Sequence, residues 1–373
     1  MQNEDIFLVA VPGLEAPLAV EAEALGFEGV KPVPGGVICG GGLEAAARAN
    51  VQLRCAVRVL LRVAEFRAMH LAQLDKRSKK VPWTDWLQPG VSVRVEAVCR
   101  RSKIYVNKAA VQRVSGGLEA AGIPVAKDGA ISVKVRIDDD LCTISLDTTG
   151  EALHRRGHKE FVGKAPMRET MAAAFLAEMG FDGTQAVVDP MCGSGTFVLE
   201  AAELALGLMP GRSRGFAFEQ MVGGSALGGD RSLRRGYLKN EELGGGGTLA
   251  PAFFGFDRND GAIRGAVANA GRSGVADVVR FERGAISDLE PPEGVAPGIV
   301  IVNPPYGGRI GERKLLFGLY GALGAVLAEK FVGWRVGIVT SDGGLAKATG
   351  LALEGGGPVD HSGTKVQLWQ AAL

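Results

Sequence analysis

The chain contains 373 residues, 46% of them apolar, which is ample for a large core and predicts two or three domains. Its 42 Lys and Arg residues nearly balance its 41 Asp and Glu residues, so the net charge of +1 by itself indicates no nucleic-acid partner. Five cysteines without a Cys-X-X-Cys pair and four scattered histidines argue against a metal site and a disulfide framework. The first residues lack signal-peptide character and no apolar run is long enough to span a membrane, so a cytoplasmic protein is expected.

Strand and helix patterns alternate from the start of the chain and predict two small α/β subdomains. Residues 1–50 suit a ferredoxin-like subdomain, and residues 51–150 continue as a second one. The acidic run 138–140 reads as a polar hairpin turn rather than a metal site. The expected strands are 6–11, 30–33 or 36–39, 91–96, 131–137 and 141–146, and the expected helices are 14–25, a helix from Leu43, another near residue 53, and 108–121.

Positive charge is concentrated in residues 48–113, which contain 15 Lys and Arg residues against 4 Asp and Glu residues. This local excess of +11 (15 minus 4) is expected of a phosphate-binding surface. Arg54, Arg58 and Arg62 recur every four residues, which predicts one stripe of a helix. A solvated basic face is the alternative for any one group. The candidate RNA-binding residues are Lys76, Arg77, Lys79, Lys80, Arg100, Arg101 and Lys103.

The second half of the chain, from residue 166 onward, alternates strands and helices after a basic, polar linker at 151–165. This alternation predicts a largely parallel sheet with ligands at the carboxyl ends of its strands. Further strands are expected at 334–341 and 366–370. A glycine-rich insert near 222–247 is expected to form a mobile loop.

A glycine turn joins a strand to a helix in the run Asp189-Pro190-Met191-Cys192-Gly193-Ser194-Gly195-Thr196. Gly193 and Gly195 let the backbone approach a ligand closely, and Thr196 is expected to cap the helix. The amino end of a helix favours an anion. The third glycine of a dinucleotide fingerprint would fall at Val198, so a pyrophosphate is disfavoured and the carboxylate of S-adenosylmethionine fits better.

An adenosyl ligand also needs an acid at the end of the next strand, to bind the ribose hydroxyls. The next strand-like run is 252–256, and it is followed by Asp257, Arg258 and Asn259. We therefore expect Asp257 to bind the ribose. A role for Asp257 as the N-cap of the segment from residue 260 is compatible with this function.

The buried strand 298–302 ends in Asn303-Pro304-Pro305-Tyr306. Proline has no N–H, so this backbone accepts hydrogen bonds but hardly donates them. The side-chain oxygen of Asn303 and the carbonyl of Pro304 can accept the two N–H bonds of an exocyclic amine, and Tyr306 can stack on its base. A loop in which prolines merely end a strand is the alternative.

The two motifs together resemble class I S-adenosylmethionine-dependent methyltransferases that act on an exocyclic nitrogen of adenine or guanine. Residues 164–175 resemble the helix before the catalytic core of THUMP-domain RNA methyltransferases, and residues 141–160 resemble the end of the THUMP module with its exit linker. Over almost its whole length the chain is similar to the amino-terminal half of the bacterial methyltransferases that modify guanine N2 in 23S ribosomal RNA.

The resemblance implies an α/β fold with a Rossmann-like class I methyltransferase domain at 166–373, preceded by a ferredoxin-like subdomain at 1–50, a THUMP domain at 51–150 and a linker at 151–165. Many relatives place an adenine-binding acid where this chain has Ala285, so either the backbone of Ala285 and Ile286 or the side chain of Asp288 takes that role. The implied cofactor-binding residues are Arg168, Glu169, Asp189, Pro190, Cys192, Gly193, Ser194, Gly195, Thr196, Asp257, Arg258, Ala285, Ile286, Asp288 and Asn303.

The expected catalytic residues are Asn303, Pro304, Pro305 and Tyr306, with S-adenosylmethionine as cofactor, RNA as partner and no metal. A cytosine-C5 mechanism is unlike this motif because it needs a cysteine where Tyr306 stands. Guanine N2 and ribosomal RNA rest on the resemblance alone. The alternatives are a transfer RNA guanine-N2 methyltransferase, an adenine-N6 methyltransferase and a non-catalytic RNA-binding assembly factor.

Overall fold

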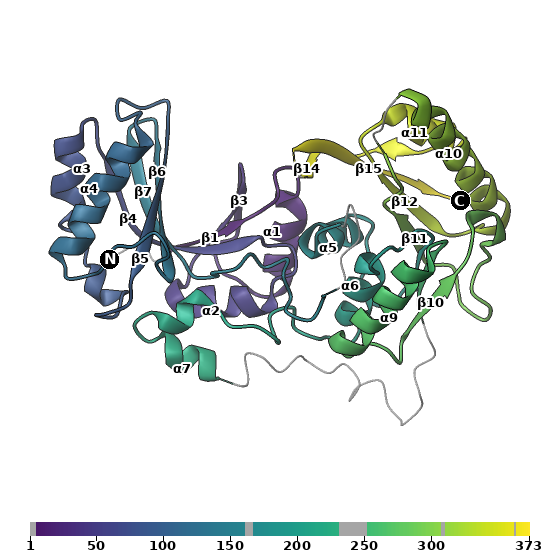
Figure 1. Ribbon diagram of the computed structural model, residues 1–373, viewed down its shortest axis with the longest axis horizontal. Helices are drawn as coiled ribbons and strands as arrows, with labels where there is room; N and C mark the ends of the chain where they lie inside the picture. The colour runs from purple at the N-terminus through teal and green to yellow at the C-terminus, as the bar shows by residue number, and fades with distance from the viewer. Residues whose placement is uncertain (1–4, 161–166, 231–251, 307–309, 362) are drawn as a thin grey trace. The chain divides into compact units, whose positions relative to one another are not determined.

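The computed structural model describes residues 5–160, 167–230, 252–306, 310–361 and 363–373 (Figure 1). The chain forms two compact units. The first unit comprises Met1–Ala10, Leu18–Leu153 and Gly211–Arg234, and the second comprises Val11–Pro17, His154–Pro210 and Arg235–Leu373. Most of the expected glycine-rich insert lies outside the described residues. No helix in the described ranges is both long and apolar enough to cross a membrane.

The first unit is built on one seven-stranded sheet in the order β2-β3-β1-β4-β7-β6-β5. Its strands are β1 (Ile6–Val9), β2 (Lys31–Val33), β3 (Gly36–Cys39), β4 (Arg58–Arg67), β5 (Val93–Arg100), β6 (Ile131–Asp138) and β7 (Leu141–Asp147). Its helical segments are α2 (Gly42–Gln52), α3 (Leu71–Ser78), η1 (Trp83–Asp85), α4 (Asn107–Ala120), η2 (Ala217–Gln220) and α7 (Gly224–Gly229), and most of α1 (Glu15–Ala24).

The two subdomains expected from the sequence share this sheet. The boundary expected after residue 50 lies inside α2, and β1 pairs antiparallel with β4. Both strands that were considered between residues 30 and 39 are present, and they pair with each other as β2 and β3. The hairpin turn expected at 138–140 joins β6 to β7, with Asp139 and Asp140 at positive φ.

The helix expected around Arg54, Arg58 and Arg62 is wrong. Arg58 and Arg62 lie in β4, and Arg54 lies in the segment that precedes this strand. A spacing of four residues also places side chains on one face of a strand, because side chains there alternate with a period of two. Val59 and Leu61 alternate with the arginines and are fully buried, and this alternation is the strand signal.

The second unit contains a mostly parallel sheet in the order β10-β9-β8-β11-β12-β15-β13, with β14 paired to β15. This arrangement confirms the expected Rossmann-like α/β fold. The strands are β8 (Val187–Asp189), β9 (Phe253–Asp257), β10 (Val279–Arg283), β11 (Ile299–Val302), β12 (Arg335–Thr340), β13 (Glu354–Gly355), β14 (Val359–His361) and β15 (Thr364–Ala372). The helical segments are α5 (Glu169–Glu178), α6 (Thr196–Ala205), α9 (Asp260–Ser273), η4 (Ile286–Asp288), α10 (Ile310–Lys330) and α11 (Gly343–Ala348).

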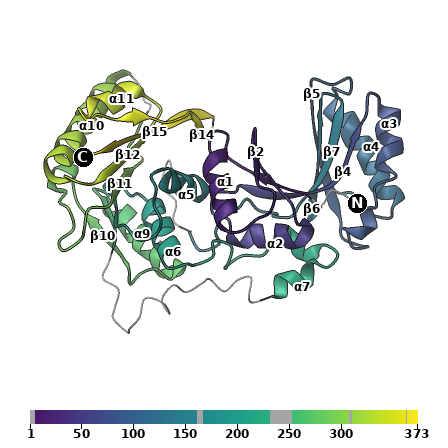
Figure 2. The same cartoon turned by 180° about the vertical axis from the view of Figure 1, so that it is seen from behind.

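Helices cover both faces of this second sheet. α5, α6 and α9 group on one side of β11 and β12, and α10 and α11 lie on the other (Figures 1 and 2). All four residues of β11 are buried, as expected of a central parallel strand. Tyr320, Leu323 and Leu327 of α10 pack into the core against Val300 and Val302 of β11. The packing of this core therefore fixes the position of the carboxyl end of β11, which Asn303 follows.

Candidate functional site

The glycine turn after β8 has the geometry of a ligand-binding loop. Gly193 and Gly195 have φ of +54° and +84°, the left-handed region that favours glycine. A Cβ on Gly195 would lie 2.8 Å from the ring of Phe281, so a larger residue is also excluded sterically. The expected capping role of Thr196 is wrong: Gly195 is the N-cap, Thr196 is the first helical residue, and no side chain caps α6. The backbone at this helix end is thus left open to a ligand.

Two acidic residues meet at this loop. Asp257, at the end of β9, accepts a hydrogen bond from the N–H of Gly193 at 3.0 Å. Asp189 is buried at the end of β8 and accepts one from the N–H of Met191 at 3.0 Å. Burial, together with the nearby charge of Asp257, raises the pKa of Asp189 to about 8. Asp189 is therefore mostly protonated at neutral pH.

The N-cap of α9 is Asn259, whose side-chain oxygen accepts from the N–H groups of Gly261 and Ala262 at 2.9 and 3.2 Å. The capping role considered for Asp257 is therefore taken by another residue. Asp257 instead accepts from the N–H of Asn259 at 2.8 Å, which fixes its carboxylate toward the glycine turn.

Beyond β10, the residues considered for adenine binding lie in and before η4. Ala285 is the N-cap of η4, and both Ala285 and Asp288 are exposed. The side chain of Asp288 accepts a hydrogen bond from Ser287, and Ile286 packs against the core. Arg258 is exposed as well. These contacts do not distinguish adenine binding by the backbone of Ala285 and Ile286 from binding by the side chain of Asp288, so both remain predictions.

The carboxyl end of β11 presents an acceptor without a donor. The Oδ1 atom of Asn303 is buried and has no hydrogen-bond partner within the part of the chain that the structure describes. Buried polar atoms are usually paired, so an unpaired one requires an explanation such as a missing ligand. Pro304 is buried, Pro305 is exposed, and the half-buried Tyr306 has its hydroxyl 2.9 Å from Nδ1 of His361.

Strand order brings these groups to one edge of the sheet. β8 lies between β9 and β11 and is parallel to both, with Asp189 opposite Gly255 and Val188 opposite Val300. The carboxyl ends of the three strands therefore meet, and they carry Asp257, Asp189 and Asn303. The next strands along the chain, β9 and β10, lie on one side of β8, and β11 and β12 lie on its other side. The strand order therefore reverses direction at β8, and in open α/β sheets ligands bind in the crevice at such a switch point.

A buried set of ion pairs connects residues 156–160 to this site. Lys159 Nζ lies 2.7 Å from Thr196 Oγ1 and 2.8 Å from Glu169 Oε1, so it joins the starts of α6 and α5. Arg156 pairs in the same way with Glu200 at 3.0 Å, and His158 Nε2 lies 2.7 Å from Glu203 Oε1.

The sequence predicted only a linker for the segment that contains Arg156, His158 and Lys159, and these contacts were not expected from it. The sequence did contain a signal for buried basic partners: Glu200 and Glu203 lie three residues apart in the otherwise apolar helix α6. Of the two α5 residues expected at the cofactor, Glu169 is held by Lys159, and Arg168 is the N-cap.

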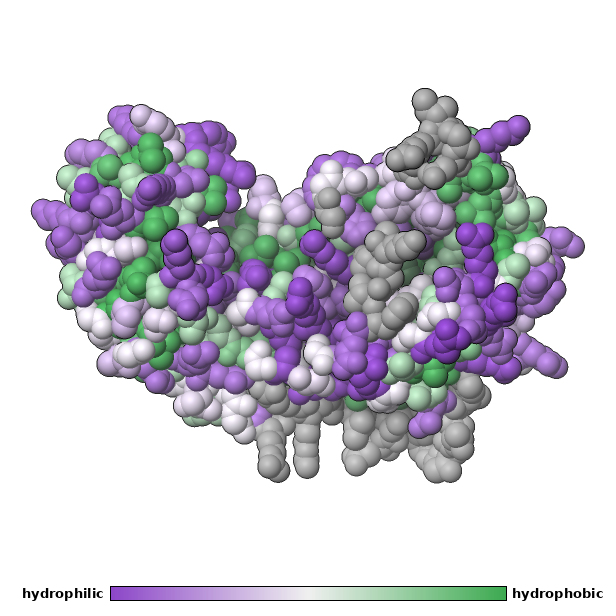
Figure 3. Space-filling view, viewed as in Figure 1, coloured by the Kyte–Doolittle hydropathy of each residue, from purple (hydrophilic) through white to green (hydrophobic). Residues whose placement is uncertain are grey.

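The candidate RNA-binding residues fall into two groups within the first unit. Lys76, Arg77, Lys79 and Lys80 are exposed on and just after α3, over which hydrophilic side chains gather in Figure 3. Arg100, Arg101 and Lys103 are exposed at the end of β5. Four of the seven side chains have intramolecular partners: Lys79 pairs with Asp75, Arg101 pairs with Asp138, Arg77 lies over the ring of Phe66, and Lys103 donates to the sulfur of Met69.

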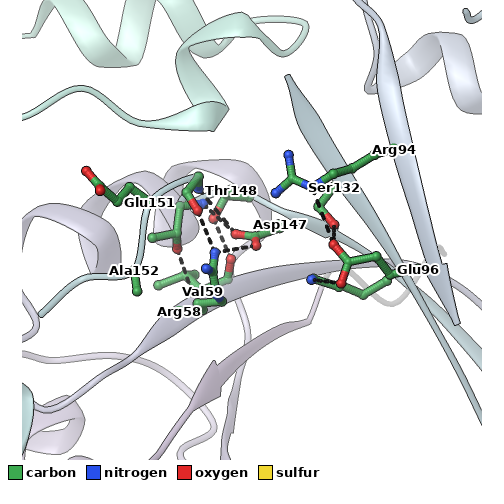
Figure 4. A network of polar contacts seen from close by, with 12 residues as sticks. Arg58, Val59, Arg94, Glu96, Ser132, Asp147, Thr148, Glu151 and Ala152 are labelled. Atoms are coloured by element: carbon green, nitrogen blue, oxygen red, sulfur yellow. Dashed lines mark hydrogen bonds and ion pairs between the residues drawn. The ribbon is translucent and has the colours of Figure 1, made fainter. Parts of the chain in front are cut away.

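Other cations of the basic segment are neutralised on the sheet. Arg58 pairs with the buried Asp147 at 2.7 Å (Figure 4). Arg94 pairs with Glu96 at 3.3 Å, and Glu96 also accepts hydrogen bonds from Ser132 and Lys134, each at 2.8 Å. Burial alone would raise the pKa of Glu96, but these hydrogen bonds lower it to about 2. These side chains stabilise the fold, and the α3 and β5 groups are the better candidates for phosphate.

Comparison with known proteins gives matches along the whole chain. Residues 156–354 match the family model described as the RMKL-like methyltransferase domain, and residues 5–60 match the RlmL ferredoxin-like domain. A putative RNA methyltransferase of Synechocystis sp. is 31% identical over 98% of this chain and 96% of its own length. The ribosomal RNA large subunit methyltransferase K/L of Syntrophotalea carbinolica is 36% identical over 92% of this chain, which spans about half of that relative. The solved structure of SMU.472, a putative methyltransferase complexed with SAH, covers 100% of the chain with a TM-score of 0.84 at 26% identity.

Proposed function

Because the chain belongs to the RMKL-like methyltransferase family and is thus an S-adenosylmethionine-dependent methyltransferase, we propose that it methylates N2 of a guanine in 23S ribosomal RNA. The observation that carries the proposal is the buried, unpaired Oδ1 of Asn303 at the carboxyl end of β11. An exocyclic amine is the donor that this acceptor lacks. A ribosomal RNA substrate would place the enzyme in the cytoplasm.

The residues at the sheet edge fit the cofactor. Gly193 leaves open the space that a Cβ would fill, α6 begins without a side-chain cap, and Asp257 already binds the N–H of Gly193. We assign the carboxylate of the cofactor to the start of α6 and its ribose hydroxyls to Asp257. When bound, the cofactor supplies an activated methyl group on a sulfonium.

The task of the chain's own residues is positioning. Asn303 Oδ1 and the Pro304 carbonyl accept the two N–H bonds of the amine and direct its lone pair toward the methyl group. The same two oxygens stabilise the positive charge that develops on nitrogen in the transition state. Tyr306 stacks on the base, which must leave its helix or come from a loop because a duplex hides the amine.

We assign RNA binding to the first unit, with residues 51–150 as a THUMP domain and 151–165 as its linker to the methyltransferase domain at 166–373. The exposed cations on α3 and after β5 support this assignment. A ribosomal RNA substrate is favoured by the K/L relatives, which are 30–36% identical to this chain, whereas guanine N2 rests on the family resemblance seen in the sequence.

The test is methylation of defined RNA pools by the purified chain. Ribosomal RNA and transfer RNA from a bacterial strain that lacks its K/L enzyme would be incubated with radiolabelled S-adenosylmethionine and digested to nucleosides for mass spectrometry. We expect N2-methylguanosine in 23S RNA. Methylation of transfer RNA alone would support the transfer RNA alternative, and N6-methyladenosine would support the adenine one. RNA binding without cofactor binding in calorimetry would support the assembly factor.

A further inference from the structure

The hydroxyl of Tyr306 is held by a residue from a distant segment. Its oxygen lies 2.9 Å from Nδ1 of His361, which is 55 residues further along the chain. Both residues belong to the second unit. His361 belongs to no motif of the sequence, and neither the glycine turn nor the Asn303 acceptor uses it.

The strand registers explain how His361 reaches this edge of the sheet. β12 is parallel to β11, and its last residue, Thr340, pairs with Gln367 of the antiparallel β15. The first residues of β15 therefore extend past the carboxyl end of β12. These residues pair with β14, with His361 opposite Thr364. The β14–β15 hairpin thus projects beyond the edge from which residues 303–306 emerge.

The protonation of Tyr306 suits a hydrogen bond from the phenol to the imidazole. Burial raises the pKa of Tyr306, so its hydroxyl keeps its proton at neutral pH and can donate. A neutral histidine with its proton on Nε2 accepts at Nδ1. The phenolic oxygen lies on the axis of the χ2 rotation, so a bond there restricts χ1 and fixes where the ring lies, and it orients the ring plane only through the direction of the O–H.

We propose that His361 is a positioning residue for the target base: by its hydrogen bond to the hydroxyl of Tyr306, it fixes the position of the ring against which the base stacks. The inference rests on the proposed function, because it needs a base at Tyr306. A ring free to rotate would still bind RNA through the rest of the surface. It would, however, present the amine to the Asn303 acceptor in fewer of the bound complexes.

A purely structural role for the contact, as an anchor for the hairpin, makes a different prediction. The hairpin has its own turn bonds, since Asp360 accepts from the N–H of Gly363 at 3.0 Å and pairs with Lys365. The Asp360→Ala variant loosens this turn without removing the contact to Tyr306. It is the matched control, and we expect it to keep its turnover.

The experiment compares His361→Ala, His361→Asn, Tyr306→Phe and the double variant His361→Ala/Tyr306→Phe in methyl transfer to 23S RNA. Loss of one hydrogen bond should lower kcat about tenfold in each single variant, with KM for RNA nearly unchanged. Asparagine places an acceptor oxygen on Cγ, where histidine has Nδ1, so His361→Asn should recover most of the rate. The double variant should be no slower than either single one, because all three lack the same bond.

Calorimetry with S-adenosylhomocysteine and thermal unfolding should show unchanged cofactor affinity and an intact fold in all variants. Multiplying effects in the double variant, or an equal loss of rate in Asp360→Ala, would overturn the positioning role. Full activity of His361→Ala would also overturn the positioning role, but it would leave the proposed function in place. Absence of RNA methylation by the unaltered chain would overturn the proposed function and this inference with it.

Discussion

Replacing Asn303 with alanine should have opposite effects on activity and on stability. The buried Oδ1 of Asn303 lacks a partner in the described part of the chain, and a buried acceptor left without a donor costs about 1–3 kcal/mol. Removing this unpaired acceptor should therefore gain about as much free energy as the lost packing of the side chain costs. The free energy of unfolding should stay the same or rise. In the reaction the same atom stabilises developing charge, and loss of one such partner lowers kcat by about 100- to 1000-fold.

The assay is single-turnover transfer from labelled cofactor to 23S RNA, paired with urea unfolding of the free protein. Asn303→Asp is the matched control, because aspartate retains the acceptor oxygen and has nearly the same shape, while it replaces the amide donor with a second, ionisable oxygen. We expect it to be faster than Asn303→Ala. The reasoning is refuted if Asn303→Ala transfers methyl groups within about tenfold of the unaltered chain. It is also refuted if that variant loses more than about 1 kcal/mol of stability, because Oδ1 would then be serving the free fold.

Three further predictions concern the cofactor loop and the RNA surface. Asp257→Asn should weaken binding of S-adenosylhomocysteine by about 10- to 100-fold in calorimetry, because hydrogen bonds to a charged group are each worth about 1.5–3 kcal/mol; unchanged affinity would exclude the ribose role. The raised pKa of Asp189 means that the folded state keeps a proton that the unfolded state releases, so its contribution to stability falls as pH rises from its usual value of 3.8 to about 8. The difference in unfolding free energy between the unaltered chain and Asp189→Asn should follow this trend, and a pH-independent difference would contradict it. Charge reversal at Lys79 and Lys80 should weaken RNA binding and lower the slope of log K against log salt by about 1 per lost phosphate contact, whereas an unchanged slope would place the RNA surface elsewhere.

Several parts of the site could be predicted from local sequence because local rules govern them. A fully apolar run before Asn303-Pro304 can only be a buried strand that ends there, and the structure has β11 at Ile299–Val302. A glycine turn between an apolar run and a helix likewise predicted where α6 begins, although Thr196 is its first residue rather than its cap.

The misassigned arginines show where local rules fail. A four-residue spacing fits one stripe of a helix and one face of a strand equally well, so Arg58 and Arg62 alone could not distinguish the two. These residues form a strand because β4 pairs with β1 and β7, which lie about 50 and 85 residues away along the chain.

The sequence by itself determined the kinds of group at this site: an amide acceptor after a buried strand, an acid after the next strand-like run, and a turn that requires glycine. Only the tertiary structure decided which of these groups meet. The order β9-β8-β11 places Asp257, Asp189 and Asn303 at one edge, and the hairpin of β14 and β15 brings His361 to Tyr306. The physical reason is that strand neighbours are chosen by the burial that distant segments share, and this choice leaves no mark on the local pattern of either segment.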